Sequence, residues 1–362
     1  MRESILTEHQ LIARFLEALR ELPDVTADLS HQEPSKPGGS WRHQARVELR
    51  VAGKSFVLLV DAKKSVFPRD AREAIGGRSR GSEGAGLADA SVPLLVAEAI
   101  SSGAKDLLRS EQIGYYDSGG SLYLPAPGAY IYIDKPAPKS LVKSVRGLFT
   151  PRRAQVLHVL LIQHQGWFGV KELAAQAMVS PATASQVMSA LEKFDWMEVR
   201  GQGPSKQRHL REPAALLDAW AKQVMALGPP TLRRYYVPGT EPEVLAARFG
   251  KVFDRNDVEY AITHEAAAQH YAPFLSSISQ VRVRVRAGAD VDAAIRDLDA
   301  RVASEGANLA VLEVASPGEL LLRERVDNLW MASPIQIYLD LLRGEGRSKE
   351  MAEHFRKERI RF

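Results

Sequence analysis

Residues 170–211 read VKELAAQAMVSPATASQVMSALEKFDWMEVRGQGPSKQRHLR, and this stretch decides how the middle of the chain folds. Residues 170–178 predict a short helix. After a brief turn, Ser180 can cap a further helix, and Pro181 suits its first position because no N–H is needed there. Apolar residues then recur at helical spacing as far as residue 194. The pattern therefore predicts two consecutive helices joined by a tight turn.

The second of these helices has two different faces. Its inner face is predicted to hold Val187, Met188 and Leu191, and its outer face Thr183, Ser185, Gln186, Ser189 and Lys193. Residues 154–163 predict another helix upstream. Downstream, residues 196–200 and 207–211 alternate like strands, and the polar tip 201–206 joins them.

Three helices followed by a basic hairpin are the order of a winged helix-turn-helix, here over residues 151–211. Small hydroxyl and amide side chains suit the major groove, and basic wing residues suit phosphates or the minor groove. The sequence therefore predicts binding to double-stranded DNA. The expected DNA-binding residues are Ser180, Thr183, Ser185, Gln186, Ser189, Lys193, Arg200, Lys206, Gln207 and Arg208. The alternative is a winged helix used only for protein contacts, because its third helix has no strong basic cluster.

The flanking regions mix helices and strands. Residues 4–22 predict an amphipathic helix, and residues 46–60 predict a hairpin whose second strand is buried on both faces. Further helices and strands follow as far as residue 133. The proline-rich and charged residues 135–143 (KPAPKSLVK) predict a linker. We therefore expect an α/β domain over residues 1–138.

A second boundary is expected at residues 227–230 (LGPP). It separates a winged-helix domain, 139–226, from a C-terminal α/β domain, 227–362. In that last domain, residues 281–286 (VRVRVR) alternate strictly and predict a half-exposed strand with an arginine face. Residues from 335 onward predict a pair of helices. The fold class expected for the whole chain is multidomain α/β.

The hairpin near residue 60 ends in Asp61-Ala62-Lys63. An acid, one spacer and a lysine after such a strand resemble the third element of PD-(D/E)XK nucleases, in which the acid binds a divalent metal and the lysine supports the attacking water. Glu48 is the one candidate for the second acid on the preceding strand. We expect a restriction-endonuclease-like domain that is inactive and holds no metal. The alternatives are a metal-dependent nuclease targeted by the winged helix and a chance D-x-K at a strand end.

Composition sets the remaining bounds. The chain has 362 residues and no cysteine, which excludes disulfides and Cys-ligated metals and suits a reducing compartment. Its net charge of +4 is mild and decides little by itself. The start MRESILTEHQ shows no signal peptide, and no apolar run is long enough for a bilayer. We therefore expect a cytoplasmic protein, without a cofactor, that is not an enzyme.

Three stretches, 92–124, 260–263 and 332–341, resemble segments of the AbiEi-type antitoxins of type IV toxin–antitoxin systems. The resemblance implies a winged-helix regulator that represses its own operon and opposes a partner toxin, which is the nucleotidyltransferase-like enzyme of the pair. A stand-alone regulator carried on a mobile element would show the same pattern. One recognition helix reads only a few base pairs, so we also expect a homodimer or paired half-sites.

Overall fold

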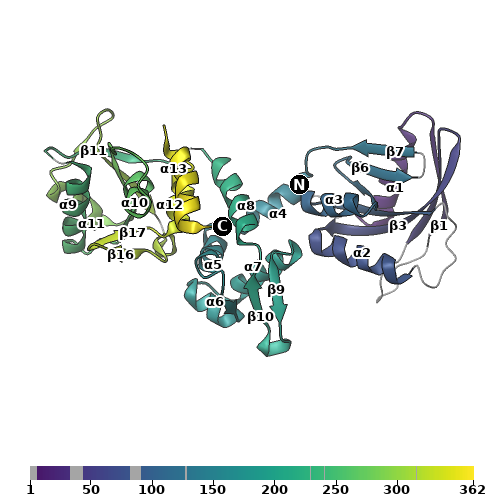
Figure 1. The fold of residues 1–362 in the computed structure, drawn as a ribbon, viewed down its shortest axis with the longest axis horizontal. Helices are drawn as coiled ribbons and strands as arrows, with labels where there is room; N and C mark the ends of the chain where they lie inside the picture. Colours follow the sequence, from purple (N-terminus) through teal and green to yellow (C-terminus); the bar gives the residue numbers. More distant parts are fainter. Residues whose placement is uncertain are drawn as a thin grey trace. The chain divides into compact units, whose positions relative to one another are not determined.

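The computed structural model describes residues 6–32, 44–81, 91–126, 129–228, 230–239, 241–314 and 316–362. The chain divides into two units, Met1–Gly147 with Ala190–Asp195, and Leu148–Ser189 with Trp196–Phe362. The described residues are mixed α/β and include two seven-stranded sheets of mixed direction (Figure 1). The α/β expectation is thus confirmed. Within the same ranges, no helix has both the length and the apolar character needed to cross a bilayer.

The first seven-stranded sheet belongs to the first unit, and its strands lie side by side in chain order, β1 to β7. Strands β1, β2 and β3 are antiparallel, β3 to β5 are parallel, and β5 to β7 are again antiparallel. The elements are α1 (Glu8–Arg20), β1 (Val25–Gln32), β2 (Ala45–Val51), β3 (Lys54–Val66), α2 (Pro68–Gly81), β4 (Ser91–Ile100), α3 (Ser102–Ser110), β5 (Gly114–Asp117), β6 (Leu122–Ala126), β7 (Ala129–Ile133) and α4 (Lys139–Leu148).

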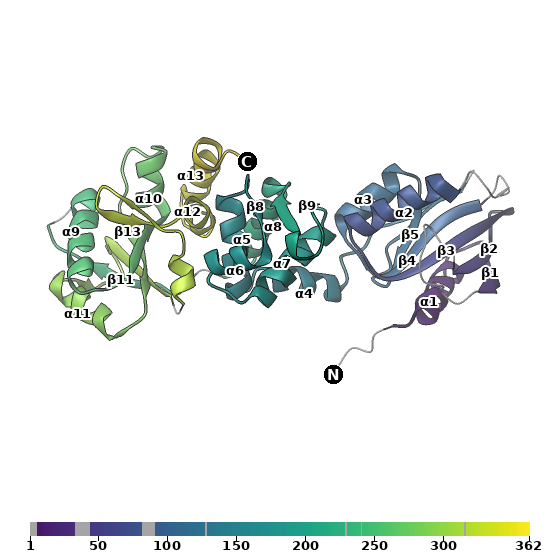
Figure 2. The same ribbon diagram turned by 90° about the horizontal axis from the view of Figure 1, so that it is seen from below.

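Helices cover both faces of this sheet (Figure 2). Helix α1 begins at a capping box between Thr7 and Gln10, and its apolar stripe packs on one face in a core that includes Phe15 and Leu58. Helices α2 and α3 cover the opposite face, where Tyr115 is fully buried. Burial on both faces explains why β3 and β4 read as nearly continuous apolar runs.

Two expectations for this unit need correction. Residues 135–143 are not a linker throughout, because α4 begins at Lys139, directly after the last proline of that stretch, Pro138. Strand β1 has no counterpart among the predicted elements. It lies at the edge of the sheet, and its sequence VTADLSHQ does alternate between apolar and polar residues from Val25 to Ser30, so this local signal was overlooked.

The second unit begins with helices and a small antiparallel sheet of order β8-β10-β9. The three helices between residues 151 and 193 and the two hairpin strands follow in the order predicted from the sequence, whereas the strand 167–168, the turn 203–205 and the helix 213–225 were not predicted. The last four residues of the third helix, 190–193, belong to the first unit. The elements are α5 (Pro151–Ile162), β8 (Trp167–Phe168), α6 (Val170–Gln176), α7 (Pro181–Lys193), β9 (Met197–Arg200), the short 3₁₀ turn η1 (Gly203–Ser205), β10 (Gln207–Leu210) and α8 (Pro213–Met225).

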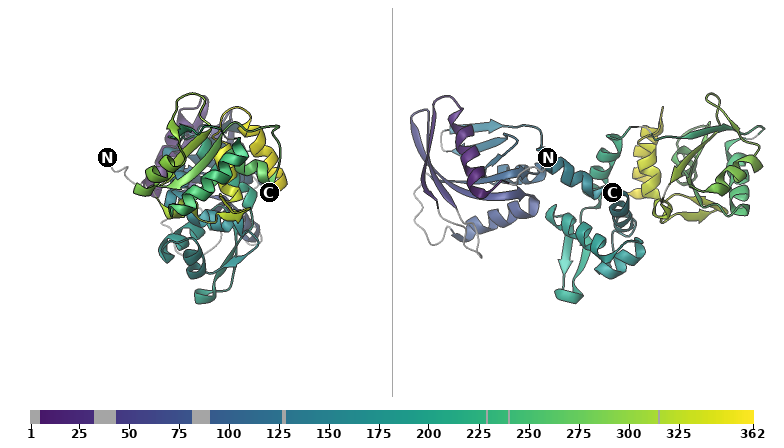
Figure 3. Two further views of the ribbon diagram at one scale, coloured as in Figure 1. Left: turned by 90° about the vertical axis from the view of Figure 1, so that its left-hand side faces the viewer. Right: turned by 180° about the vertical axis from the view of Figure 1, so that it is seen from behind.

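The rest of the second unit is built on the other seven-stranded sheet, of order β14-β11-β15-β13-β12-β17-β16. Helices α9 and α11 pack together, whereas α10, α12 and α13 form a separate helical layer (Figures 2 and 3). The elements are β11 (Arg233–Tyr236), α9 (Pro242–Arg255), β12 (Tyr260–Thr263), α10 (His264–Tyr271), β13 (Val281–Arg286), α11 (Ala289–Asp297), β14 (Arg301–Val302), β15 (Leu309–Val314), η2 (Pro317–Leu320), β16 (Glu324–Val326), β17 (Leu329–Met331), α12 (Pro334–Leu341), α13 (Ser348–Phe355) and η3 (Arg356–Ile360).

Strand β13 corrects the prediction made from VRVRVR. It lies inside the sheet, between β15 and β12, and is not half-exposed. Arg286 is exposed and Arg282 is half-buried, but Arg284 retains only 7% of its accessible surface. The alternation identifies the strand correctly, but the face that carries Arg284 is covered.

Candidate nucleic-acid interface

The start of α7 has the predicted cap. The Thr183 backbone N–H donates to Ser180 Oγ at 3.2 Å, and the two hydroxyl oxygens lie 3.0 Å apart. A capping hydroxyl accepts from a backbone N–H that would otherwise lack a partner at the helix start. Ser180 and Thr183 therefore start the helix, and their hydroxyls are already engaged in local hydrogen bonds.

The two faces of α7 separate largely as predicted. Val187, Met188 and Leu191 are fully buried. Gln186, Ser189 and Lys193 are exposed, and their spacing of three and four residues places them in one stripe along the helix. Thr183 and Ser185 are half-buried beside that stripe. The groups best placed to meet a ligand are therefore the amide, hydroxyl and ammonium of the stripe.

A neighbouring helix holds the side chain of Gln186. Arg153, on α5, donates from Nη2 to Gln186 Oε1 at 3.0 Å. Because a guanidinium has donors only, this bond assigns the amide oxygen to the side facing Arg153. A carbonyl oxygen has two lone pairs, so Oε1 can still accept a second hydrogen bond while Nε2 donates elsewhere.

Arg200, on β9, is exposed and held from two sides. Its guanidinium carbon lies 4.2 Å from the centre of the Trp167 ring, which is within the range of a cation–π contact. Its Nε and Nη2 both donate to Gln207 Oε1, at 3.0 and 2.7 Å. Trp167 was not among the predicted site residues, although the Trp-Phe pair of β8 was the visible signal. Gln207 is half-buried on the adjacent strand β10, and its role is to hold the Arg200 guanidinium in place by accepting these hydrogen bonds.

Arg208 does not fit its predicted role as a phosphate ligand. It retains 6% of its accessible surface, and its Nη1 lies 3.8 Å from Met188 Sδ, under the sheet. The reason is its position on β10, the central strand of the three, where alternation turns Arg208 and the fully buried Leu210 to the inner face. Lys206, at the tip of the hairpin, is half-buried.

Charge is unevenly distributed along the sequence. Residues 151–211 contain eight Lys and Arg against four Asp and Glu, whereas the whole chain contains 48 against 44. The entire positive surplus of the chain therefore falls in these 61 residues, and the rest is balanced. Five of the eight basic side chains are exposed, namely Arg152, Lys171, Lys193, Arg200 and Arg211.

The nuclease-like residues of the first unit, Asp61 and Lys63, lie within β3, which continues to Val66 and does not end at Asp61 as the sequence predicted. Asp61 retains 8% of its accessible surface, and Lys63 Nζ lies 4.0 Å from its Oδ2. Burial raises the pKa of Asp61 to about 6, although the charge of Lys63 opposes this shift. A metal-ligating carboxylate has to be ionised, so its burial works against metal binding.

The proposed second acid is not beside the first. Glu48 pairs with Val57 across β2 and β3, four residues before Asp61, or roughly 13 Å at 3.3 Å per residue. Gln44, directly before β2, lies beside this part of β3, and its side-chain amide bonds the backbone of Ala62 at 3.1 and 3.3 Å. Among the described residues, no group of three or more His, Asp or Glu side chains is arranged to hold a metal ion.

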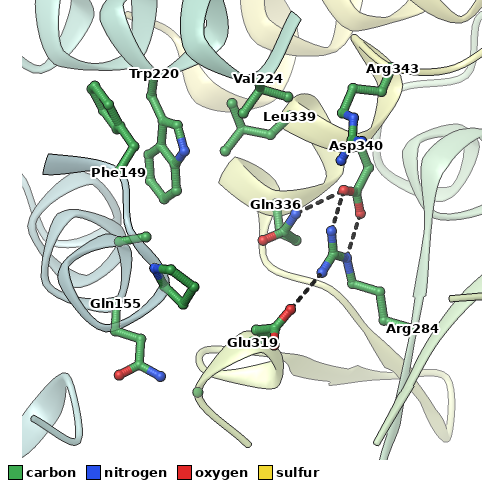
Figure 4. A pocket seen from close by; sticks show the side chains of 13 residues that line it. Phe149, Gln155, Trp220, Val224, Arg284, Glu319, Gln336, Leu339, Asp340 and Arg343 are labelled. Atoms are coloured by element: carbon green, nitrogen blue, oxygen red, sulfur yellow. Dashed lines mark hydrogen bonds and ion pairs between the residues drawn. The ribbon is translucent and has the colours of Figure 1, made fainter. Parts of the chain in front are cut away.

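A second polar cluster, which the sequence did not predict, is buried in the second unit. Arg284 donates from Nε and Nη2 to the two carboxylate oxygens of Asp340, at 2.8 and 2.6 Å (Figure 4). Thr263 Oγ1 and Gln336 Nε2 donate to the same carboxylate at 2.5 and 2.8 Å. Burial alone would raise the pKa of Asp340, but the charge and hydrogen bonds of Arg284, with smaller effects of His264 and Thr263, lower it to about 2. Asp340 is therefore an ionised, fully hydrogen-bonded anchor on α12.

Two histidines lie close to this anchor. His158, on α5, contacts Ser333 Oγ through Nε2, and Ser333 in turn caps α12. Burial lowers the pKa of His158 to about 4, and the nearby charge of Arg284 contributes. Burial likewise lowers the pKa of His264 to about 4. Both side chains are therefore neutral at pH 7, and the cluster is a structural element rather than an acid–base site.

Comparison of the chain with protein-family models, curated proteins and solved structures finds no match.

Proposed function

We propose that residues 151–211 form a winged helix-turn-helix and that the chain is a sequence-specific DNA-binding transcriptional regulator. The observation that carries this proposal is the charge distribution, because the whole positive surplus of the chain falls in the segment that carries the exposed stripe of α7. Binding to a polyanion requires such a local surplus, since each neutralised phosphate releases counterions. The order α5, α6, α7, β9, β10 supports the winged-helix assignment.

In this proposal α7 enters the major groove. Gln186 can bond the N6 and N7 edge of adenine through its amide, with Arg153 fixing the orientation of that amide. Ser189 and Lys193 follow along the same stripe and suit a base edge or a phosphate. Arg200, pre-oriented by Trp167 and Gln207, suits insertion into the minor groove or a phosphate contact.

Several wider roles belong to the same proposal. The succession α1-β1-β2-β3-α2-β4, with Asp61 and Lys63 on β3, supports a restriction-endonuclease-like first unit. We infer that this unit is inactive, because Glu48 is far from Asp61 and Gln44, directly before β2, lies next to Ala62 instead. The resemblance to AbiEi-type antitoxins adds autoregulation as a repressor, action in the cytoplasm and a cognate toxin as partner.

A direct test measures the affinity for duplex DNA at several salt concentrations by fluorescence anisotropy. Arg200→Ala and Lys193→Ala should each weaken binding to all duplexes and reduce the log–log salt slope by about 1. Matched controls are Arg255→Ala and Lys251→Ala, which remove exposed helical charges of α9 in the second unit. If all four variants show the wild-type slope, the winged helix does not bind DNA. Thermal unfolding checks that each variant is folded.

A second test concerns the assembly on DNA. One recognition helix contacts only a few base pairs, so we propose a homodimer on a repeated half-site, with centres about one helical turn apart. Selection from random duplexes followed by footprinting should recover an inverted or direct repeat. A single unrepeated half-site, protected by a monomer, would exclude the dimer while leaving DNA binding intact.

A further inference from the structure

The outer edge of β7 is the least protected edge of the two seven-stranded sheets. β7 (AYIYI) is the last strand of the first sheet, and no strand of the described ranges pairs with its outer side (Figure 1). It contains no charged residue. Its tyrosines remain open to solvent, Tyr130 with 69% and Tyr132 with 42% of the accessible surface. Such an edge is a template for a further strand.

The other edges of these sheets carry features that disfavour pairing. β1, at the opposite edge of the first sheet, has an irregular register between Leu29 and His31 and exposes Asp28. β14 and β16, at the edges of the second sheet, have two and three residues and include Arg301 and Arg325. Bulges, short strands and charged side chains all protect an edge. β7 has five residues, a regular register and no charge.

The backbone groups that β7 turns outward belong to its two tyrosines. Tyr130 lies opposite Pro125 of β6, which has no N–H, so this pair does not exchange hydrogen bonds. Hydrogen-bonded and non-bonded pairs alternate along antiparallel strands. Ile131 therefore bonds β6, whereas Tyr130 and Tyr132 direct their N–H and C=O groups away from the sheet.

A second copy of β7 matches this edge when it runs antiparallel about a two-fold axis at Ile131. Tyr130 then lies opposite Tyr132 of the second copy, and each such pair exchanges both of its hydrogen bonds. Ile131 faces its own counterpart. An axis at either tyrosine would place the other tyrosine opposite a residue beyond the strand. The register at Ile131 is thus the one that uses every outward group of both tyrosines.

The tyrosine rings are already held in place before any association. Tyr123 contacts both rings edge-on, with its ring centre 5.7 Å from that of Tyr130 and 6.3 Å from that of Tyr132. Arg109, on α3, lies 5.2 Å from the centre of the Tyr132 ring and donates to its hydroxyl. Side chains that are ordered in advance lose less entropy on binding.

The available surface sets the strength of the contact. An aromatic side chain buries roughly 150–250 Å², so Tyr130 and Tyr132 together can bury roughly 170–280 Å² in each copy. The half-buried Ala129, Ile131 and Ile133 add a smaller area. Interfaces of standard size bury about 800 Å² per partner, and smaller ones are weak or transient. β7 therefore supports a dimer with a dissociation constant in the micromolar range.

We propose that two copies of the chain associate through their β7 edges, antiparallel about Ile131, so that their first sheets join into one continuous sheet. The occupant is a second copy because each tyrosine then meets a tyrosine and the paired strands bury no charge. Each copy has one such edge, so association stops at the dimer. The inference gives an interface to the homodimer proposed on DNA, but it does not rest on DNA binding.

Analytical ultracentrifugation of the full chain without DNA, from submicromolar to several hundred micromolar concentration, should show a monomer that becomes a dimer and no larger species. Tyr130→Lys places a charge on the edge and should raise the dissociation constant about 10-fold or more. The matched control is Tyr236→Lys, which changes a tyrosine of 45% exposure on β11, an interior strand of the second sheet. It should leave the dissociation constant unchanged.

A single cysteine tests the register, because the chain has none of its own. In the proposed dimer Ile131 faces its counterpart in a non-hydrogen-bonded pair, with Cα atoms about 4.5 Å apart, a distance that a disulfide can span. Ile131→Cys should therefore form a disulfide-linked dimer under mild oxidation. Val302→Cys is the control, because Val302 is 86% exposed on β14 and random collisions would favour it.

Three results would overturn the proposal. The wild-type chain could stay monomeric at several hundred micromolar, and if it still selected a repeated DNA site, the proposed function would stand without this interface. Tyr130→Lys could associate like the wild type, which would place the interface elsewhere. Val302→Cys could cross-link as fast as Ile131→Cys, which would exclude the register. Thermal unfolding shows whether each variant is folded, and Tyr130→Lys provides the test if Ile131→Cys does not fold.

Discussion

Lowering the pH from 7 to 5 should weaken the second unit, because two buried histidines have to stay neutral while the chain is folded. The pKa of His158 falls from 6.5 to about 4, and that of His264 does the same. As the pH drops below 6.5, the unfolded chain takes up protons on both side chains, and the folded chain does not until about pH 4. The free energy of unfolding therefore decreases across this window and levels off below it.

The magnitude follows from these values. A histidine whose pKa is 6.5 in the unfolded chain and about 4 in the folded chain lowers the free energy of unfolding at pH 5 by roughly 2 kcal/mol. His158 and His264 together should cost roughly 4 kcal/mol. Asp340 contributes little, because its pKa of about 2 in the folded chain and its ordinary value of 3.8 in the unfolded chain both leave it ionised between pH 7 and 5. Asp61, in the first unit, has a raised pKa and acts in the opposite direction below pH 6.

Hydrogen exchange with mass spectrometry can measure this change in peptides from α5 and α12, after correction for the intrinsic exchange rate at each pH. His158→Gln can keep a hydrogen bond to Ser333 but does not titrate, so it should lose about half of the pH dependence. The control substitution His9→Gln replaces an exposed histidine of α1, in the first unit. It should leave the pH dependence of the α5 and α12 peptides unchanged. If the backbone amides of α12 were equally protected from hydrogen exchange at pH 7 and pH 5, the claim that these histidines are buried in the neutral form would be refuted.

Three further predictions use other assays. Asp340→Ala should lower the free energy of unfolding by about 3–5 kcal/mol in urea, and the double change Arg284→Met with Asp340→Leu should restore most of it; wild-type stability of Asp340→Ala would contradict the buried ion pair. Gln186→Ala should cost about 1–3 kcal/mol on a selected duplex and much less on random DNA; an equal loss on both would mean that Gln186 does not read bases. Magnesium or manganese should not produce cleavage of plasmid DNA, and Asp61→Ala should leave DNA affinity unchanged; nicking that Asp61→Ala abolishes would establish a nuclease.

Elements with a strong local signal can be predicted from the sequence. The apolar residues that recur at helical spacing in α1 include the leucines and the phenylalanine that are buried against the first sheet in the structure. The cap at Ser180 marks the start of α7, because both the hydroxyl and the following proline are local features.

Features that depend on distant parts of the chain cannot be predicted in this way. The alternation of β13 locates a strand, but the covering of Arg284 depends on Asp340, 56 residues away. Arg208 is a basic residue of a hairpin, and its burial depends on β10 being the central strand. The separation of Glu48 from Asp61 follows from the register between β2 and β3, which neither residue type reveals.

The pairing of Arg284 with Asp340 has a consequence for the time course of synthesis. At about 5–20 residues per second, the ribosome makes Asp340 roughly 3–11 seconds after Arg284. During that interval strand β13 carries a cation whose partner does not yet exist, and burying it in the sheet would be strongly unfavourable. We therefore expect this sheet to close only after α12 has emerged, which leaves its central strand open to chaperones while the chain is still being made.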